Sequence, residues 1–105
     1  MRVLIVCGAG ASSTFVAQRL RRAAAARGLE LTAIASSASA APDLIPTVDV
    51  VLAGAHLGDA LEALRAAASA VEVPFLVLAD AAREDGDALL DSTLAAVAAP
   101  RERIT

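Results

Sequence analysis

Short runs of apolar, mostly branched residues recur along this chain and are separated by longer stretches rich in Ala, Leu and Arg. Most of the runs are nearly continuous in apolar residues and lack the alternation with polar residues that marks a half-exposed strand. Continuous apolar strands are typical of a parallel sheet covered on both faces. The pattern therefore predicts strands over residues 2–7, 49–53 and 74–79, and the alternation of apolar and polar residues over 29–35 predicts one more strand.

The longer stretches have the apolar spacing of amphipathic helices. They predict helices over residues 13–27, 58–70 and 84–98, and a loop with one helical turn over 36–46. In the first helix, Gly28 is expected to follow the last turn as the terminating residue. The side of that helix expected to face the core consists of Phe15, Val16, Leu20, Ala23 and Ala24.

The order of these elements requires a parallel sheet with helices on both faces. Right-handed crossovers from a central first strand give the strand order 2-1-3-4, a three-layer α/β/α arrangement with a truncated flavodoxin-like sheet. A chain of 105 residues fits one domain. We expect that domain over residues 1–99, with a frayed tail over 100–105.

Composition excludes several classes of function. A net charge of −3 with no Lys argues against a nucleic-acid partner. No apolar stretch approaches the roughly 20 residues that span a bilayer. The single Cys precludes an internal disulfide, and a strand starts at Met1 without a signal peptide, so we expect a cytoplasmic protein. One His and one Cys are too few for a zinc site, so no metal or organic cofactor is expected.

The candidate site follows the first strand. Parallel sheets bind ligands beyond the carboxyl ends of the strands where the strand order reverses, here between the first and third strands. The first strand ends at Cys7, and a segment of small residues with two glycines leads into a helix expected to start near Ser13. Amides of such a loop, together with a helix N-terminus, bind anions and favour the thiolate of an adjacent Cys. A nucleophilic thiol beside a cradle of amides is the minimum needed to form phosphocysteine.

A structural interpretation of the same residues stands beside the chemical one. A lone Cys at the end of a buried strand is commonly an inert core residue, and Ser12, Ser13 and Thr14 are common helix N-cap residues. The position of Cys7 directly before a Gly-containing loop and a helix start favours the reactive thiol.

The segment Val3–Val16, in the order strand, Cys, small loop, Ser-Ser-Thr and helix, resembles the lactose/cellobiose-type IIB subunit of the bacterial phosphoenolpyruvate-dependent sugar phosphotransferase system. The resemblance in element order extends to about residue 98. It implies that Cys7 accepts a phosphoryl group from a phosphohistidine of the IIA protein and passes it to a sugar held by the membrane permease IIC, with transient docking at the inner face of the membrane. It also implies a phosphate-binding segment made of Gly8, Ala9, Gly10, Ala11, Ser12, Ser13 and Thr14.

The chain departs from that family near the third strand. Gly54–Leu57 stands where many members carry a Pro-Gln-like pair, and the chain has neither Lys nor Tyr, so the sugar and the partner specificity stay open. His56 is a candidate rim contact with the phosphoryl group; the alternative is a surface His. Arg19, Arg21 and Arg22 form either a solvated face or a surface that steers an acidic IIA partner.

Two other functions compete with the carrier. Low-molecular-weight phosphatases and arsenate reductases resemble this chain in fold, but their loop closes with an Arg six residues after the Cys, where this chain has Ser13. They also require an Asp-Pro acid, which the sequence lacks. A non-catalytic anion-binding regulatory domain is the second alternative, and it predicts that Cys7→Ser keeps function.

Overall fold

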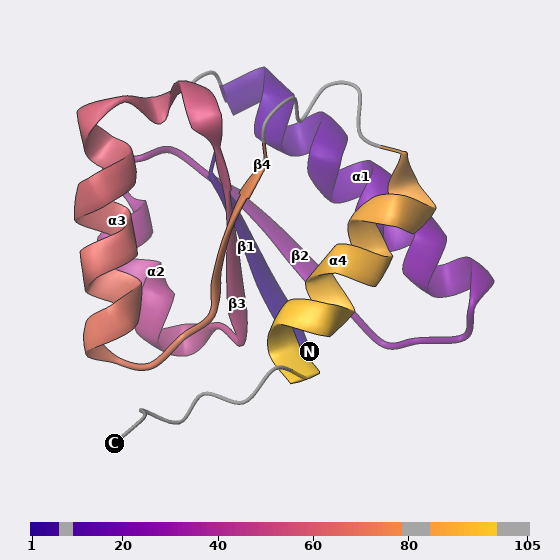
Figure 1. Ribbon diagram of the computed structural model, residues 1–105. Helices are drawn as coiled ribbons and strands as arrows, with labels where there is room; N and C mark the ends of the chain where they lie inside the picture. Colours follow the sequence, from indigo (N-terminus) through magenta and orange to yellow (C-terminus); the bar gives the residue numbers. More distant parts are fainter. Residues whose placement is uncertain (7–9, 79–84, 99–105) are drawn as a thin grey trace.

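Four parallel strands form a single sheet in the order β2-β1-β3-β4, which confirms the predicted topology (Figure 1). The computed structural model describes residues 1–6, 10–78 and 85–98, with the side chains of all of these except residues 10–13 and 56. The strands are β1 Arg2–Val6, β2 Thr32–Ser36, β3 Val50–Gly54 and β4 Phe75–Leu78. The helices are α1 Gly10–Ala26, α2 Ala41–Leu44, α3 Asp59–Ala70 and α4 Gly86–Ala98, with 3-10 turns η1 Ile45–Thr47 and η2 Ala55–Leu57.

Helices cover both faces of the sheet, so the three-layer α/β/α architecture is also confirmed (Figure 1). Alternate residues of β1 enter opposite core layers: Val3 and Ile5 pack in the layer with α1 and α4, and Leu4 and Val6 in the layer with α2 and α3. All four are completely buried. Because both faces of the central strands are buried, their sequences are continuously apolar.

Hydrogen bonds pin the amino ends of β1 and β3 together. The backbone N–H of Arg2 donates to Asp49 Oδ2 at 2.7 Å, and the Arg2 Nε donates to the Thr47 carbonyl at 2.9 Å. The Asp49 N–H donates in return to the Arg2 carbonyl at 2.8 Å. These bonds fix the register of the central strand pair at the edge where the chain begins. The last described helix, α4, ends at this same edge (Figure 1).

Gly28 terminates α1 as predicted. It has a positive φ of 71°, its N–H donates to the Ala25 carbonyl at 3.1 Å, and the Leu29 N–H donates to the Ala24 carbonyl at 2.9 Å. This is the Schellman pattern of helix termination. It also corrects the expected start of the second strand, since Leu29 belongs to the helix cap and β2 begins only at Thr32.

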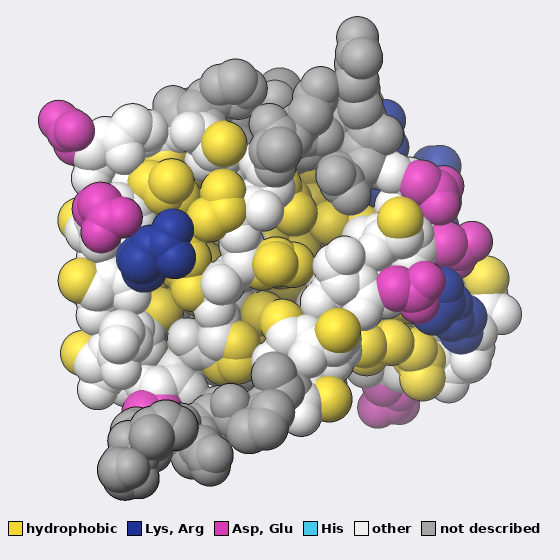
Figure 2. Space-filling model, in the orientation of Figure 1, with side chains coloured by type: hydrophobic (Ala, Val, Ile, Leu, Met, Phe, Trp, Pro, Cys, Tyr) yellow, Lys and Arg dark blue, Asp and Glu magenta, His cyan; other side chains and the backbone are white. Residues whose placement is uncertain are grey.

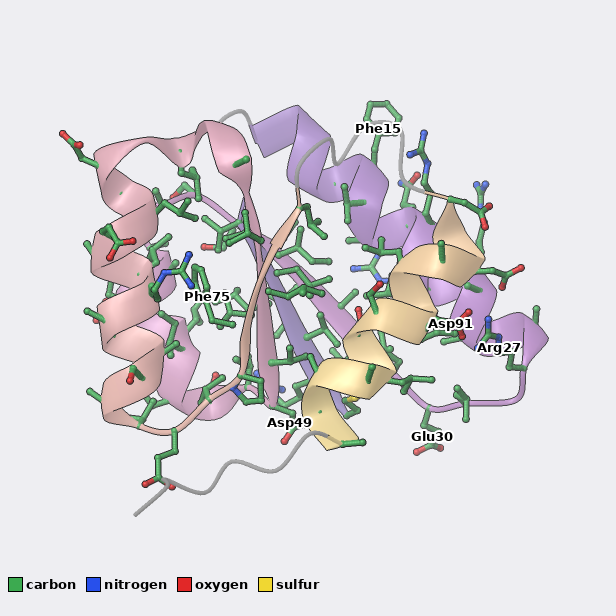
Figure 3. The ribbon with its side chains drawn as sticks, viewed as in Figure 1. Phe15, Arg27, Glu30, Asp49, Phe75 and Asp91 are labelled. Atoms are coloured by element: carbon green, nitrogen blue, oxygen red, sulfur yellow. The ribbon has the colours of Figure 1, made fainter. Side chains whose placement is uncertain are left out.

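The amino end of α1 differs from expectation in two ways. The helix begins at Gly10, one turn earlier than the predicted start near Ser13. Val16, Leu20, Ala23 and Ala24 are buried as expected, but Phe15 is 61% exposed. Figure 3 shows its ring pointing away from the sheet, so the assignment of Phe15 to the core was wrong.

Helix α1 packs against α4 and is linked to it by an ion pair. Arg27 Nη1 lies 2.8 Å from Asp91 Oδ1, and Arg27 Nη2 lies 3.4 Å from Asp87 Oδ1; Arg27 and Asp91 face each other in Figure 3. The hydrogen bond to Asp91 is the main cause that raises the pKa of the Arg27 guanidinium. Because both carboxylates are exposed, the pair contributes little to stability.

Strand β4 is an edge of the sheet and is only partly covered. Phe75, Leu76 and Val77 are half-buried, and Figure 2 shows hydrophobic side chains on this side of the molecule between α3 and α4. The guanidinium carbon of Arg65 lies 5.2 Å from the centre of the Phe75 ring, which is a typical distance for a cation–π contact. The Arg65 side chain therefore covers part of this edge.

Asp85 caps α4, which begins at Gly86 and not at residue 84 as predicted. Its carboxylate accepts from the Ala88 N–H at 3.3 Å, and its carbonyl accepts from the Leu89 N–H at 2.8 Å. We expect Asp85→Ala to lower the free energy of unfolding in urea by about 1 kcal/mol, and Asp85→Asn to lose much less because the amide oxygen still accepts the bond. Equal losses in the two variants would contradict the capping role.

Candidate functional site

The strand order reverses at β1, because β2 lies on one side of β1 and the next strand, β3, lies on the other. Val6, the last residue of β1, is in register with Ser36 of β2 and with Ala53 of β3. The chain returns from β1 to β2 through α1 on one face, and from β2 to β3 through α2 on the other (Figure 1). The end of β1 is therefore the switch point at which open α/β sheets bind ligands.

Three of the predicted site residues, Cys7, Gly8 and Ala9, lie outside the described residues. The fully buried Val6 holds the chain immediately before them at the switch point.

The next predicted site residues, 10–13, are helical rather than part of a loop, because they form the first turn of α1. This correction does not remove their amides from the site, since the first four N–H groups of a helix have no acceptor within the helix. No acidic residue lies in this first turn, so no carboxylate there neutralises the positive end of the helix dipole. Thr14, the last residue of the predicted set, is exposed in α1.

The backbone of His56 lies in η2, which follows β3 directly. Since β3 is a neighbour of β1, this turn belongs to the same carboxyl edge as the end of β1. Gly58 then adopts a φ of 63° and leads the chain into α3. The structure thus brings the backbones of His56 and of the start of α1 to one edge.

The end of β2 adds a group of hydroxyls that the sequence pattern, as a soft Ser- and Ala-rich loop, does not single out. The Ser36 hydroxyl donates to the Ser37 carbonyl at 2.9 Å, and the hydroxyls of Ser37 and Ser39 lie 3.2 Å apart. Ser37 also accepts from the Ala40 N–H at 3.3 Å. The signal that identifies them is the placement of a Ser run directly after a strand that neighbours the first one.

The expected stripe of three arginines on α1 is divided by the structure. Arg21 Nη2 donates to the Ala33 carbonyl of β2, so this guanidinium is tied to the sheet. Arg21 and Arg22 are both exposed, and Arg19 is half-buried. The hydrogen bond to the sheet therefore distinguishes Arg21 from Arg22, although both side chains face solvent.

Neither a metal cluster nor a membrane span occurs in the described part of the chain. No three His, Cys, Asp or Glu residues among those described are grouped so that they could hold a metal ion. Within the same residues no helix is both long enough and apolar enough to cross a bilayer.

A family profile described as "PTS system, Lactose/Cellobiose specific IIB subunit" matches residues 2–92. The chain belongs to this family. As a IIB family member it is a component of phosphotransferase-system sugar phosphotransfer, with phosphotransferase activity in the general sense, and IIB domains work with other components of that system.

The fold of this IIB chain is also that of a solved structure. The lactose-specific IIB component domain of the phosphoenolpyruvate:carbohydrate phosphotransferase system from Streptococcus pneumoniae superposes with a TM-score of 0.80. The match covers 91% of this chain and 96% of that chain, at 13% sequence identity. No curated protein sequence is significantly similar to this chain.

Proposed function

We propose that this IIB protein carries a phosphoryl group on Cys7, and that residues 8–14 bind the phosphoryl oxygens. The observation that carries the proposal is that Val6 ends β1 at the switch point of the sheet, and that the only Cys of the chain follows Val6 directly in the sequence, three residues before the start of α1. The amides at the start of α1 favour a thiolate and then a phosphoryl dianion. Phosphoryl transfer depends mainly on such positioning and charge stabilisation.

The donor in this proposal is the phosphohistidine of a IIA protein. The Cys7 thiolate attacks the phosphorus, the S–P bond forms, and the P–N bond breaks with its electron pair remaining on the imidazole nitrogen, which takes up a proton. In the second transfer a hydroxyl of a sugar held by the IIC permease attacks the phosphorus. The S–P bond then breaks, the thiolate is regenerated, and the hydroxyl proton is released to a base.

Four further assignments accompany the carrier. The domain extends over residues 1–99, because Thr93 in α4 is buried and Leu94, Ala96 and Val97 pack against the core beyond the end of the family match. The protein acts in the cytoplasm, at the inner face of the membrane. Since IIA and IIC must reach the same sulfur, they bind in turn. His56 is proposed as a rim contact of the phosphoryl group.

Ser13 favours transfer over hydrolysis. It stands where the related phosphatase loops place an Arg, and without that Arg the charge of a hydrolytic transition state is poorly stabilised.

Mass spectrometry tests the proposal directly. After incubation with phosphoenolpyruvate, the general phosphotransferase proteins and IIA, we expect one phosphoryl group on the protein, stable in acid, labile to iodine and mapped to Cys7. A protein that stays unmodified while IIA is phosphorylated, or that carries the group elsewhere, would overturn the carrier function.

A further inference from the structure

Phe15 is the one large apolar side chain of α1 that does not pack in the core. The residue is 61% exposed, more than any other large hydrophobic residue among those described. Val16 and Leu20, on the side of α1 that faces the core, are completely buried. An exposed aromatic residue on a protein surface is a candidate contact with a partner, because aromatic residues are enriched among those that dominate binding energy.

Phe15 lies close to the switch point. It is five residues from the start of α1 at Gly10, a distance of about 7.5 Å along the helix axis. Figure 3 shows the ring at the end of α1 nearest the carboxyl edge of the sheet and directed outward. A protein that approaches the end of β1 from the α1 side therefore meets this ring.

The same helix face carries positive charge. Gln18 and Arg22 are exposed on the side of Phe15, at helical spacings of three and seven residues. We call Phe15, Gln18 and Arg22 the α1 stripe. Arg22 lies about 10 Å further along the axis than Phe15. The stripe thus combines an apolar anchor near the site with a cation farther from it.

The charge of the chain is strongly divided in sequence. Residues 1–29 contain five Arg and no acidic residue, whereas residues 30–105 contain all 12 acidic residues and four Arg. The two parts have net charges of +5 and −8, which together give the −3 of the whole chain. Helix α1 itself contains three of these five arginines and no acidic residue, so it is a basic element in an acidic protein.

From these observations we propose that the α1 stripe is the docking surface for the phosphoryl donor, a IIA protein that presents an apolar pocket with an acidic rim. The inference rests on the proposed carrier function. The alternative occupant within that function, the membrane permease, is disfavoured by charge: cytoplasmic loops of membrane proteins carry an excess of Lys and Arg and would repel the stripe. An acidic donor is attracted to it and reaches the end of β1 from the α1 side.

Single-turnover transfer from phosphorylated IIA to Cys7 tests the surface. The probe is a phosphorylated lactose/cellobiose-type IIA protein from the same genome, at varied concentration. We expect Phe15→Ala to raise the half-saturating IIA concentration at least about tenfold, the effect of removing an interface anchor. The rate at saturating IIA should stay unchanged, because the ring does not touch the reacting atoms.

Arg22→Glu tests the charge of the stripe. We expect it to slow transfer about threefold to tenfold at low salt and to have little effect at high salt, because rim charges act mainly on the association rate. Val71→Ala is the matched apolar control, since Val71 is 45% exposed at the end of α3, and it should change neither quantity.

The outcomes separate the two proposals. If the wild-type protein acquires no phosphoryl group on Cys7, the carrier function fails. If the wild type is phosphorylated and Phe15→Ala behaves like Val71→Ala, only the docking surface is wrong. It is also wrong if Phe15→Ala leaves transfer from IIA intact but lowers sugar phosphorylation by IIC membranes, or if it only converts a dimer into a monomer in sedimentation, because the occupant is then the permease or a second copy.

Discussion

Cys7→Ser should abolish phosphoenolpyruvate-dependent phosphorylation of the sugar. A Ser hydroxyl is a weak nucleophile at neutral pH unless a general base activates it, whereas a helix N-terminus favours the nucleophilic thiolate form of a neighbouring Cys. We expect the rate of sugar phosphate formation, measured with membranes containing IIC, to fall to the level seen without the IIB protein. The variant should still fold, because one small side chain is replaced by another.

A relocated thiol provides the control. The double variant Cys7→Ser, Ser92→Cys keeps one Cys in the chain but places it at an exposed position of α4. It should be as inactive as Cys7→Ser alone, because activity requires the thiol at the switch point. Substantial sugar phosphate formation with Cys7→Ser itself would show that this thiol is not the phosphoryl acceptor, and would overturn the carrier proposal.

The second large effect concerns the core. Leu52 lies at the centre of β3, in register with Ile5 of β1 and Leu76 of β4, and has no exposed surface. Leu52→Ala should lower the free energy of unfolding by about 2–5 kcal/mol, since it loses the transfer energy of the side chain and leaves a cavity. That is a large fraction of the roughly 5–15 kcal/mol that holds such a domain together.

Urea unfolding followed by circular dichroism measures this loss, because the chain has no Trp or Tyr for fluorescence. Val71→Ala, at an exposed position, should change the free energy of unfolding by no more than about 0.5 kcal/mol. A loss below about 1 kcal/mol in Leu52→Ala would contradict tight packing around the centre of the sheet.

The sequence predicts the sheet well because its central strands have little freedom. Every residue from Val3 to Val6 is buried, alternately in one layer and the other. A strand of this kind fits only the interior of a parallel sheet, and right-handed crossovers then leave few strand orders. Strand order and layers therefore follow from local sequence.

The start of α1 is harder to predict because local signals oppose it. Gly10 is a poor helix former, and residues 10–13 contain no large apolar side chain that would show a helical period. These residues nevertheless form the first turn.

Phe15 illustrates a second limit. Ala is tolerated both in the core and in solvent, as Ala24 and Ala25 show within one turn of α1. An Ala-rich helix therefore gives a weak indication of which side is buried, and a single aromatic residue is easily assigned to the wrong one. The candidate site was located by topology, whereas the direction of this ring required the structure.

The amino edge of the sheet, where Arg2 and Asp49 hold β1 and β3 together, has a practical consequence. Met1 and the end of α4 lie on this side of the molecule, and the switch point lies on the other (Figure 1). A fluorescent label, an affinity tag or a tether to a surface attached at Met1 would therefore leave the proposed phosphoryl-transfer end of the sheet accessible to the two proposed partners.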